Sequence, residues 1–374
     1  MGSSGINRPR TRLVVGALGG ALAAALLSGC PKGDTGADGD GGTSGAAAPS
    51  FSLAWSEYPS WSTFGVAHEA KLINGNQGEL GEIEKKWNVD IVLKEADYDS
   101  CLTMYATLAC DAVCITNMDV LQPSLSRPSV AVLPTSTSKG ADACIVAGVE
   151  SVQDLKGKKV YGLEKSVSEY CFVRNLELLG EQEADYSFVN KDPGAAATAM
   201  QQKQEGYEAI VVWNPFVLET LNKRPDAKVL FDSSTIPGEI VDMVVIGQET
   251  LDKPGGERFA AAVIDTFYAI NQRLADPAKG DETLVALGKK FSNLGLEDMK
   301  KVVAQTVFYK DPAEGRGLFT GAELPKTMER VVSFCVSHKI TDKEPALAYG
   351  PKDAGAGAAL RFDPTFIDMA KARQ

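Results

Sequence analysis

The sequence predicts a two-lobed α/β fold with a hinge and a helical C-terminal extension. Short apolar runs alternate with amphipathic runs from Phe51 onward, which is typical of strands that cross to helices and form a largely parallel sheet. One plan occurs twice, because "CDAVCITN" and "YEAIVVWNPF" each place an acidic residue before an apolar strand and a polar corner after it. With 374 residues, of which 44% are hydrophobic, the chain is long enough for two cores.

The first 29 residues are expected to be an export signal. Arg8, Arg10 and Arg12 precede an apolar stretch over residues 13–27, and small residues follow it. The four residues "LSGC" at 27–30 resemble the lipobox of bacterial lipoproteins. The resemblance implies cleavage before Cys30 and acylation of its thiol, so that a lipid would anchor the chain to a membrane. The competing interpretation is an uncleaved apolar helix with an incidental cysteine.

Residues 30–50 are expected to form a flexible tether, since Gly, Asp, Ser and Ala dominate them without an apolar period. The formal charge of −11 argues against a nucleic-acid partner, which would need a basic face to meet phosphates. Neither a metal site nor a Cys/His catalytic pair is indicated, because the only histidines are His68 and His338. Buried free thiols are the favoured state of the six later cysteines, which are Cys101, Cys110, Cys114, Cys144, Cys171 and Cys335.

Two series of elements follow the tether. The first lobe, residues 51–145 with 243–374, is expected to have strands and helices at 51–55, 63–73, 89–95, 98–109, 110–116 and 129–136. The second lobe, residues 146–242, is expected to have them at 152–164, 166–180, 185–190, 192–204 and 207–216. A strand within 236–247 is expected to pair with 142–148 as a two-stranded hinge. The helical tail after Gly247 is interpreted as scaffold that packs on the first lobe.

Ligand-contacting residues are expected where strands end, because ligands of open α/β sheets lie outside the carboxyl ends of the strands. The first lobe offers corners after residues 55, 116 and 136. The second lobe offers the corners at 164–168 and 213–215. The sequence therefore predicts two half-sites that face each other across a cleft.

Several of these segments resemble the solute-binding proteins of ABC importers in the nitrate, sulfonate and taurine group. The resemblance covers nearly all of residues 51–275 and is carried by "DLKGKKV" with the Ser-rich helix start after it, by "GYEAIVVWNPF", and by the pair "STSKGADACIV" and "IPGEIVDMVVIG". It implies a type II-like periplasmic-binding-protein fold, a location in the cell envelope, a small-molecule ligand, and ABC permease and ATPase partners. "CDAVCITNMD", "LEKSVSEY" and "FDSSTIPGEIVD" are most similar to the branch found beside urea carboxylase genes, whose cargo is thought to be urea or guanidinium.

The charges at the expected corners favour a cation or a neutral donor-rich molecule over an anion. Only Lys139 and Lys165 are basic there, whereas an anion that leaves water needs positive partners. The acidic residues at the same corners are Glu57, Asp119, Asp142, Glu164, Glu169, Glu239 and Asp242. Guanidinium suits this set, because it is planar, meets carboxylates bidentately and stacks on aromatic faces. Sulfonate, taurine, nitrate and a pyrimidine precursor stay open as alternatives.

The corner "WNPF" is interpreted as ligand-facing: Trp213 offers a ring, Asn214 offers amide hydrogen bonds, and Pro215 fixes the turn. Each such residue also has a structural interpretation. Trp213 could be core, Asp142 could hold the hinge, and Asp119 could cap a helix. The full set of expected ligand-binding residues is Trp55, Glu57, Trp61, Asn117, Asp119, Ser136, Thr137, Asp142, Glu164, Ser166, Ser168, Trp213, Asn214 and Glu239.

We expect a monomeric receptor that closes on one solute, with no catalytic residue and no cofactor. An enzyme is the competing class, since biosynthetic enzymes of the related pyrimidine-forming family share the two-lobed fold. A sensor that closes on its ligand without transport is a third possibility.

Overall fold

The computed structural model describes residues 47–373, which form one compact unit. The expected signal segment, Cys30 and most of the expected tether lie outside the described residues. Ser50, expected as the last tether residue, already begins the first strand. No helix among residues 47–373 is both long and apolar enough to cross a membrane.

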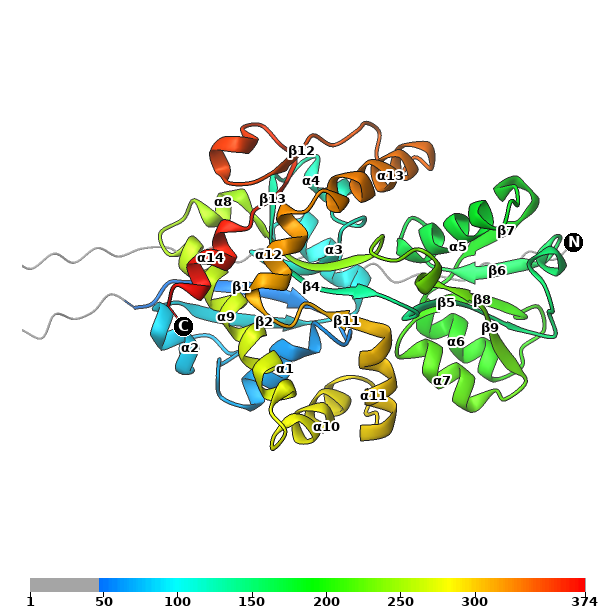
Figure 1. Cartoon of the computed structure of the whole chain (residues 1–374), viewed down its shortest axis with the longest axis horizontal. Helices are drawn as coiled ribbons and strands as arrows, with labels where there is room; N and C mark the ends of the chain where they lie inside the picture. The colour runs from blue at the N-terminus through cyan, green and yellow to red at the C-terminus, as the bar shows by residue number, and fades with distance from the viewer. Residues whose placement is uncertain (1–46, 374) are drawn as a thin grey trace, which may run out of the picture. The chain divides into compact units, whose positions relative to one another are not determined.

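Two sheets organise the described chain (Figure 1). The first sheet has eight strands in the order β12-β13-β4-β10-β3-β1-β2, with β11 paired to β4. Its strands are β1 (Ser50–Trp55), β2 (Asp90–Glu95), β3 (Ala112–Thr116), β4 (Ser129–Ser138), β10 (Val241–Gly247), β11 (Thr306–Phe308), β12 (Leu347–Tyr349) and β13 (Leu360–Phe362). The second sheet has the order β7-β6-β8-β5-β9. Its strands are β5 (Asp142–Ala147), β6 (Lys159–Gly162), β7 (Ser187–Asn190), β8 (Ala209–Trp213) and β9 (Ala227–Asp232).

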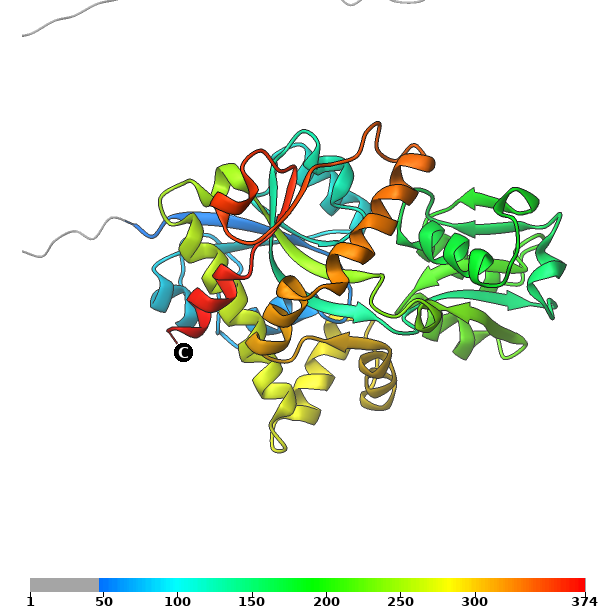
Figure 2. The same cartoon turned by 45° about the horizontal axis from the view of Figure 1, so that its top comes forward.

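Helices cover both sheets, as Figures 1 and 2 show. We call each sheet with its helices a lobe. The helices of the second lobe are α5 (Val167–Leu178), α6 (Pro193–Gln201) and α7 (Phe216–Lys223). The helices of the first lobe are α1 (Ser62–Glu69), α2 (Glu82–Trp87), α3 (Tyr98–Ala106), α4 (Leu121–Ser124), α8 (Gln248–Leu251), α9 (Gly256–Ala275), α10 (Gly280–Lys290), α11 (Leu296–Gln305), α12 (Pro312–Thr320), α13 (Glu323–Ser337) and α14 (Thr365–Lys371). Short 3₁₀ turns occur at Val152–Leu155, Glu183–Asp185, Ser233–Thr235 and Lys352–Gly355.

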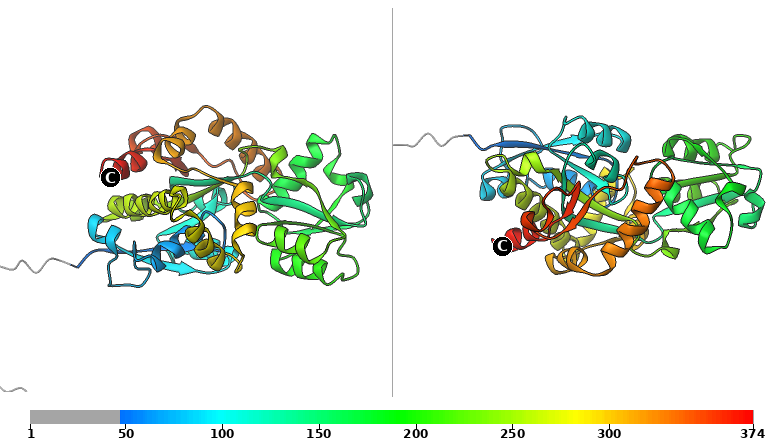
Figure 3. Two further views of the ribbon diagram at one scale, coloured as in Figure 1. Left: turned by 60° about the horizontal axis from the view of Figure 1, so that its bottom comes forward. Right: turned by 90° about the horizontal axis from the view of Figure 1, so that it is seen from above.

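The core of the first lobe lies between its sheet and the long helix α9. Phe259, Val263 and Phe267 of α9 are fully buried. Helix α14 packs beside α9, as the two views in Figure 3 show. The six later cysteines are all buried and unpaired in the described chain. Buried in this way, the six cysteines pack as small apolar side chains of the core. Burial also raises the pKa of the Cys110 thiol to about 11.

Two crossings join the lobes, and their hydrogen bonds define the hinge. Between β4 and β5 the chain turns at Gly140, whose φ of +99° is a left-handed conformation that favours glycine. Between β9 and β10 it passes through Ser233, whose Oγ lies 2.7 Å from the Ser138 Oγ and accepts the Gly140 amide at 2.7 Å. Thr137 Oγ1 donates to the Ile240 carbonyl at 2.8 Å. The crossings are therefore bonded directly to each other.

The strand pairing corrects three expectations. The expected hinge pair does not form, because β10 pairs antiparallel with β3 and β4, while β5 pairs with β8 and β9 in the second sheet. The change of sheet comes before Asp142, a few residues earlier than the expected boundary at 145. The sheets are also mixed, since β10 and β5 run antiparallel to their neighbours. A strand that returns through a hinge enters its sheet from the cleft side, and its direction is reversed as a result.

Candidate functional site

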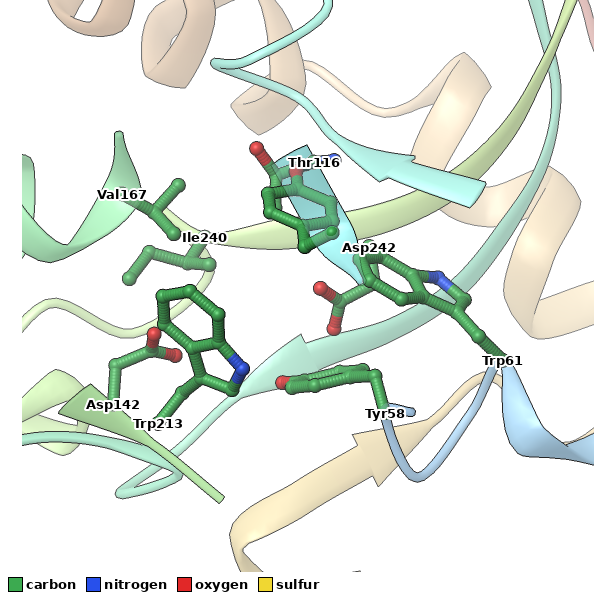
Figure 4. A pocket seen from close by; sticks show the side chains of 9 residues that line it. Tyr58, Trp61, Thr116, Asp142, Val167, Trp213, Ile240 and Asp242 are labelled. Atoms are coloured by element: carbon green, nitrogen blue, oxygen red, sulfur yellow. Dashed lines mark hydrogen bonds between the residues drawn. The ribbon is translucent and has the colours of Figure 1, made fainter. Parts of the chain in front are cut away.

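A small cavity lies where the two sheets meet (Figure 4). Its empty volume is about 300 Å³. This volume lies at the lower end of the range for small-molecule pockets, which is about 300–1,000 Å³, so the cavity suits a small ligand. Its lining residues are Tyr58, Trp61, Tyr98, Thr116, Asp142, Val167, Trp213, Ile240 and Asp242.

Strand register brings the polar lining residues together from both lobes. In the second sheet, Asp142 at the start of β5 is paired with Trp213 at the end of β8. In the first sheet, Asp242 near the start of β10 is paired with Thr116 at the end of β3. Because β5 and β10 are antiparallel to these partners, their first residues lie at the carboxyl ends of β8 and β3. Each lobe therefore contributes one aspartate beside the hinge.

Four aromatic rings form one continuous wall of the cavity. Tyr58 and Trp61 have ring centroids 4.8 Å apart, and Trp61 stacks on Tyr98 at 5.5 Å and 17°. Tyr98 then meets Trp213 edge-on at 6.0 Å, a contact that joins the lobes. All four side chains are at least nine-tenths buried. Such rings present negative faces, which attract a cation that has lost its water.

Two buried polar atoms of this wall have no partner among the described residues. They are Trp61 Nε1 and the Tyr58 hydroxyl oxygen, and the Tyr58 hydroxyl still lies close enough to Asp242 to lower the pKa of that carboxyl, against the rise that burial causes. Figure 4 shows the Tyr58 hydroxyl and the indole nitrogen of Trp213 directed toward the middle of the cavity. A buried polar group without a hydrogen bond costs about 1–3 kcal/mol. A ligand that forms hydrogen bonds with these atoms would remove this cost, so the cavity favours such a ligand.

The two cavity aspartates are buried without a cation beside them. Asp142 is 3% exposed and Asp242 is 1% exposed, and neither has an ion-pair partner in residues 47–373. Burial raises the pKa of the Asp142 carboxyl to about 6, against a hydrogen bond from Ser138. Burial raises the pKa of Asp242 well above its ordinary range, although the Ser136 hydroxyl donates to Asp242 Oδ2 at 2.5 Å. The charge of Asp142 adds to that rise.

A third aspartate stands directly behind the aromatic wall. Asp119 Oδ2 accepts the Tyr98 hydroxyl at 2.7 Å and the Thr116 hydroxyl at 2.9 Å, while Oδ1 has no partner in the described chain. Burial raises the pKa of Asp119 to about 6, against those two hydrogen bonds. Asp119 in turn raises the pKa of Asp142 and of Asp242. The three carboxyls therefore share one negative potential.

A wider pocket, which we call the vestibule, adjoins the cavity and shares Tyr98 and Trp213 with it. Its empty volume is about 1260 Å³. The vestibule is lined by Ser56, Glu57, Glu95, Ala96, Asp97, Tyr98, Asp99, Leu163, Asn190, Asp192, Pro193, Trp213 and Phe216. Neither lining includes a lysine, arginine or histidine.

The fourteen expected residues fall into four groups. Trp61, Asp142 and Trp213 line the cavity, and Glu57 lines the vestibule. Asp119 and Ser136 lie one hydrogen bond behind the cavity. Lys139 and Lys165, the two expected cations, are exposed and outside both linings.

The hinge and α5 hold a third group of expected residues. Asn117 accepts the Val241 amide at 3.0 Å and donates to the Glu239 carbonyl at 3.0 Å, and Thr137 bonds Ile240. Ser166 caps α5 by accepting the Ser168 amide at 3.1 Å. The Ser168 hydroxyl is buried and has no hydrogen-bond partner in residues 47–373.

The remaining expected residues have structural partners away from the cavity. Trp55 is buried in the core of the first lobe, in close contact with Gly65 of α1. Asn214 donates to the side chain of Gln305 on α11 at 2.8 Å, so it ties the second lobe to the tail. Glu164 is exposed and accepts the Asn190 amide at 3.0 Å.

Glu239 belongs to an ion network at the back of the hinge. Arg174 Nε of α5 lies 3.0 Å from its Oε2, and Arg330 Nε of α13 lies 3.5 Å from its Oε1. The Tyr170 hydroxyl donates to Oε2 at 2.5 Å. Although burial raises it, the net shift of the Glu239 pKa is downward, because Arg174 and Tyr170 stabilise the charged form. Glu239 therefore links both lobes and is satisfied by the protein itself.

The expected set of ligand-binding residues lacks Tyr58, Tyr98, Thr116 and Asp242, although Asp242 is counted among the acids at the expected corners. Tyr58 and Tyr98 follow the ends of β1 and β2 within three residues, so the strand-end signal does reach them. Asp242 begins a strand rather than ending one, and its position follows only from the antiparallel pairing of β10. No group of three or more potential ligand residues in the described chain could hold a metal ion.

Comparison with solved structures identifies the fold. No family model matches the chain, and no curated protein matches it. The periplasmic aliphatic sulphonate-binding protein SsuA from Escherichia coli aligns over 79% of this chain and 94% of its own, at 17% identity and a TM-score of 0.63. SsuA from Xanthomonas axonopodis, bound to MOPS, aligns over 84% and 99%, at 15% identity and a TM-score of 0.64.

A third neighbour is the zinc-bound ligand-binding component of an ABC-type import system from Staphylococcus aureus. It aligns over 86% of this chain and 99% of its own, at 10% identity and a TM-score of 0.61. The chain therefore has the two-lobed fold of periplasmic binding proteins. At these identities the likeness defines the fold alone, and the cargo has to be argued from the cavity.

Proposed function

We propose that this protein is the solute-binding subunit of an ABC importer and that its cargo is a small planar cation of the guanidinium type. The observation that carries the proposal is the cavity itself. Asp142 and Asp242 face it from opposite lobes, four aromatic rings wall it, and its lining includes no basic side chain. A desolvated cation supplies what each of these groups lacks.

Guanidinium fits the chemistry of the lining. Its N–H donors point outward in one plane, so it can meet carboxylates on two sides while its face lies on an indole or phenol ring. With four heavy atoms it also suits the small open space. Urea has the same shape without the charge, so it would leave the two carboxylates uncompensated. We therefore place guanidinium before urea.

A sulfonate cargo, as bound by the SsuA neighbours, has the wrong sign for this cavity. An anion would lie beside two buried carboxyls with no arginine, lysine or histidine among the lining residues. Sulfonate binding nevertheless stands as the principal competing outcome of the test, because structural neighbours have that cargo.

The mechanism follows from the hinge and needs no chemical step. The crossings 139–141 and 233–240 are short and bonded to each other, so the lobes can rotate about them. Closure brings Asp142 toward Asp242 and Trp213 onto Tyr98. The closed receptor would then deliver its cargo to a permease and ATPase, held at the membrane by acylated Cys30 and acting as a monomer.

The test is calorimetric binding to the chain from residue 47 onward, which is one compact unit with its own core. Guanidinium chloride, urea, taurine, ethanesulfonate and nitrate are titrated at low millimolar concentration, with sodium chloride as the ionic control. A ligand at 100 times its Kd should add about 2.7 kcal/mol to the free energy of unfolding. Binding of taurine or ethanesulfonate without guanidinium would overturn the proposed cargo. A substrate turned over in these mixtures would instead support the enzymatic alternative.

A further inference from the structure

The vestibule is lined by acidic side chains that have no ion-pair partner in the described chain. Its five carboxylates all belong to exposed residues, and none has an ion-pair partner in residues 47–373; they are Glu57, Glu95, Asp97, Asp99 and Asp192. Other acidic groups on the described surface do have such partners. Asp252 lies 2.6 Å from Lys352, and Asp111 lies 3.0 Å from Lys253.

The repulsion among these groups is visible at Glu57. Burial raises its pKa, a hydrogen bond from Ser292 lowers it, and the charges of Glu95 and Glu219 raise it further. Asp97 stays ionised, because the Ser100 hydroxyl and amide hold its pKa below the ordinary value. Neighbouring carboxylates repel one another, and this repulsion destabilises their charged forms unless a cation lies between them.

The vestibule leads to the cavity through the contact of Tyr98 with Trp213. Both rings line both spaces, and they come from opposite lobes. At a centroid distance of 6.0 Å the two rings are in contact, and they separate the vestibule from the cavity. Behind them, the Tyr58 hydroxyl is directed into the cavity (Figure 4). Asp142 lines the same cavity without a cation beside it in the described chain, and Ser138 is its hydrogen-bond partner.

We propose that the vestibule is the entrance for the cargo, where its unpaired carboxylates gather cations from solution, and that Tyr98 and Trp213 are the gate that shuts behind the cargo. The proposal rests on the proposed function, since it needs a cationic cargo. Glu57, Glu95 and Asp99 then determine specificity through the rate of capture, without touching the enclosed ligand.

The physical basis is electrostatic steering. A recess lined by one sign of charge raises the local concentration of the opposite ion and increases association rates by about 10–10³-fold. The effect weakens with salt, because the Debye length is about 10 Å at 0.1 M ionic strength. Dissociation starts from a ligand held behind the closed gate. We therefore expect the vestibule charges to change association much more than dissociation.

The experiment is stopped-flow binding of guanidinium, monitored through the fluorescence of the cavity tryptophans. The triple variant Glu57→Gln, Glu95→Gln, Asp99→Asn is compared with the unsubstituted protein between 10 and 500 mM sodium chloride, a range of about sevenfold in Debye screening length. We expect association at low salt to fall by about threefold to tenfold. Dissociation should stay within about twofold, and the salt dependence of association should flatten.

A matched control removes equal charge elsewhere. Glu257→Gln, Glu344→Gln, Asp353→Asn changes three exposed acids outside both linings and should leave association unchanged. The association rate of urea should be the same in both triple variants and at every salt concentration, because urea carries no charge. If the vestibule triple does not fold, the single Glu95→Gln carries the same comparison with an effect of about twofold.

The outcomes separate this inference from the proposed function. Guanidinium that binds with association rates unaffected by the vestibule triple would overturn the entrance and keep the cargo. A change confined to dissociation would do the same. Absence of guanidinium binding to the unsubstituted protein would overturn both.

Discussion

Two groups of buried carboxylates lie at the same hinge and are treated in opposite ways. Glu239 has Arg174, Arg330 and the Tyr170 hydroxyl around it, and its pKa is lowered. Asp142 and Asp242 have no cation beside them in the described chain, and their pKa values are raised. The protein thus neutralises the acid that fastens the lobes and leaves bare the acids that face the cavity. The difference supports the proposed cationic cargo, which would bring the missing positive charge with it.

The largest expected effect is on Asp142→Asn. Guanidinium affinity should fall more than about 100-fold, which is about 2.7 kcal/mol, because the enclosed cation loses a buried counter-charge. The empty protein should become more stable by about 1–3 kcal/mol at pH 7, since an uncompensated charge is removed. Calorimetric titration and denaturant unfolding measure the two changes, with exposed Asp353→Asn as control. Full guanidinium affinity in Asp142→Asn would remove the basis of the comparison.

Next comes Glu239→Gln, which should act in the reverse direction on stability. Arg174 would lose its buried partner, so the free energy of unfolding should fall by about 2 kcal/mol. Glu177→Gln is the matched control, because Glu177 also pairs with Arg174 but is 56% exposed. Its effect should stay below about 1 kcal/mol. Equal losses in the two variants would show that the Glu239 network does not fasten the lobes.

The pH dependence of binding should follow the cavity aspartates. A carboxyl with a raised folded-state pKa must lose its proton before it can pair with a cation. Guanidinium affinity should therefore rise by about tenfold between pH 5 and pH 7, around the pKa of about 6 of Asp142. Isothermal titration across this range measures the effect, and Asp142→Asn should flatten it.

The stability of the empty protein should show the opposite trend in an overlapping range. Because the folded-state pKa values of Asp142 and Asp119 lie above those of the unfolded chain, their favourable contribution is complete below the ordinary value of 3.8. It is lost as pH rises through about 6. Glu239 opposes this trend, since its lowered pKa adds stability that is lost on acidification. Saturating guanidinium should reverse the loss near neutrality.

The smallest expected effect is that of Trp213→Leu. The substitution keeps an apolar side chain but removes a ring face, which is worth about 0.5–2 kcal/mol to a desolvated cation. Guanidinium affinity should fall by about 2-fold to 30-fold, and any urea affinity should fall less, because urea has no charge. Competition calorimetry measures both. An equal loss for the two ligands would reduce Trp213 to a packing residue.

Much of this architecture follows from local sequence. The apolar runs that became β1, β3, β4 and β8, and the capped starts of α5 and α6, lie close to their expected places. The corner at Trp213 also faces the cavity, because a strand end and a fixed turn are local properties. Strand ends, turns and helix caps can therefore be predicted from short stretches of sequence.

The rest depends on long-range pairing that no local pattern encodes. Asp242 joins the cavity only because β10 returns antiparallel between β3 and β4. Glu239 was expected to contact the ligand, but it pairs with Arg174 and Arg330, which are far from it in the sequence. The C-terminal helices expected as scaffold also reach the second lobe, where α11 supplies Gln305 to Asn214 and α13 supplies Arg330.

The division of the two cavity acids between β5 and β10 bears on release. For the proposed cationic cargo, each lobe would carry half of the counter-charge, so neither lobe alone would hold a dehydrated cation well. A permease that pries the lobes apart would dismantle the affinity through distance, with no rotamer change and no competing ion. Separation of the lobes would then be sufficient to release the cargo, because the binding site exists only while the two lobes are together.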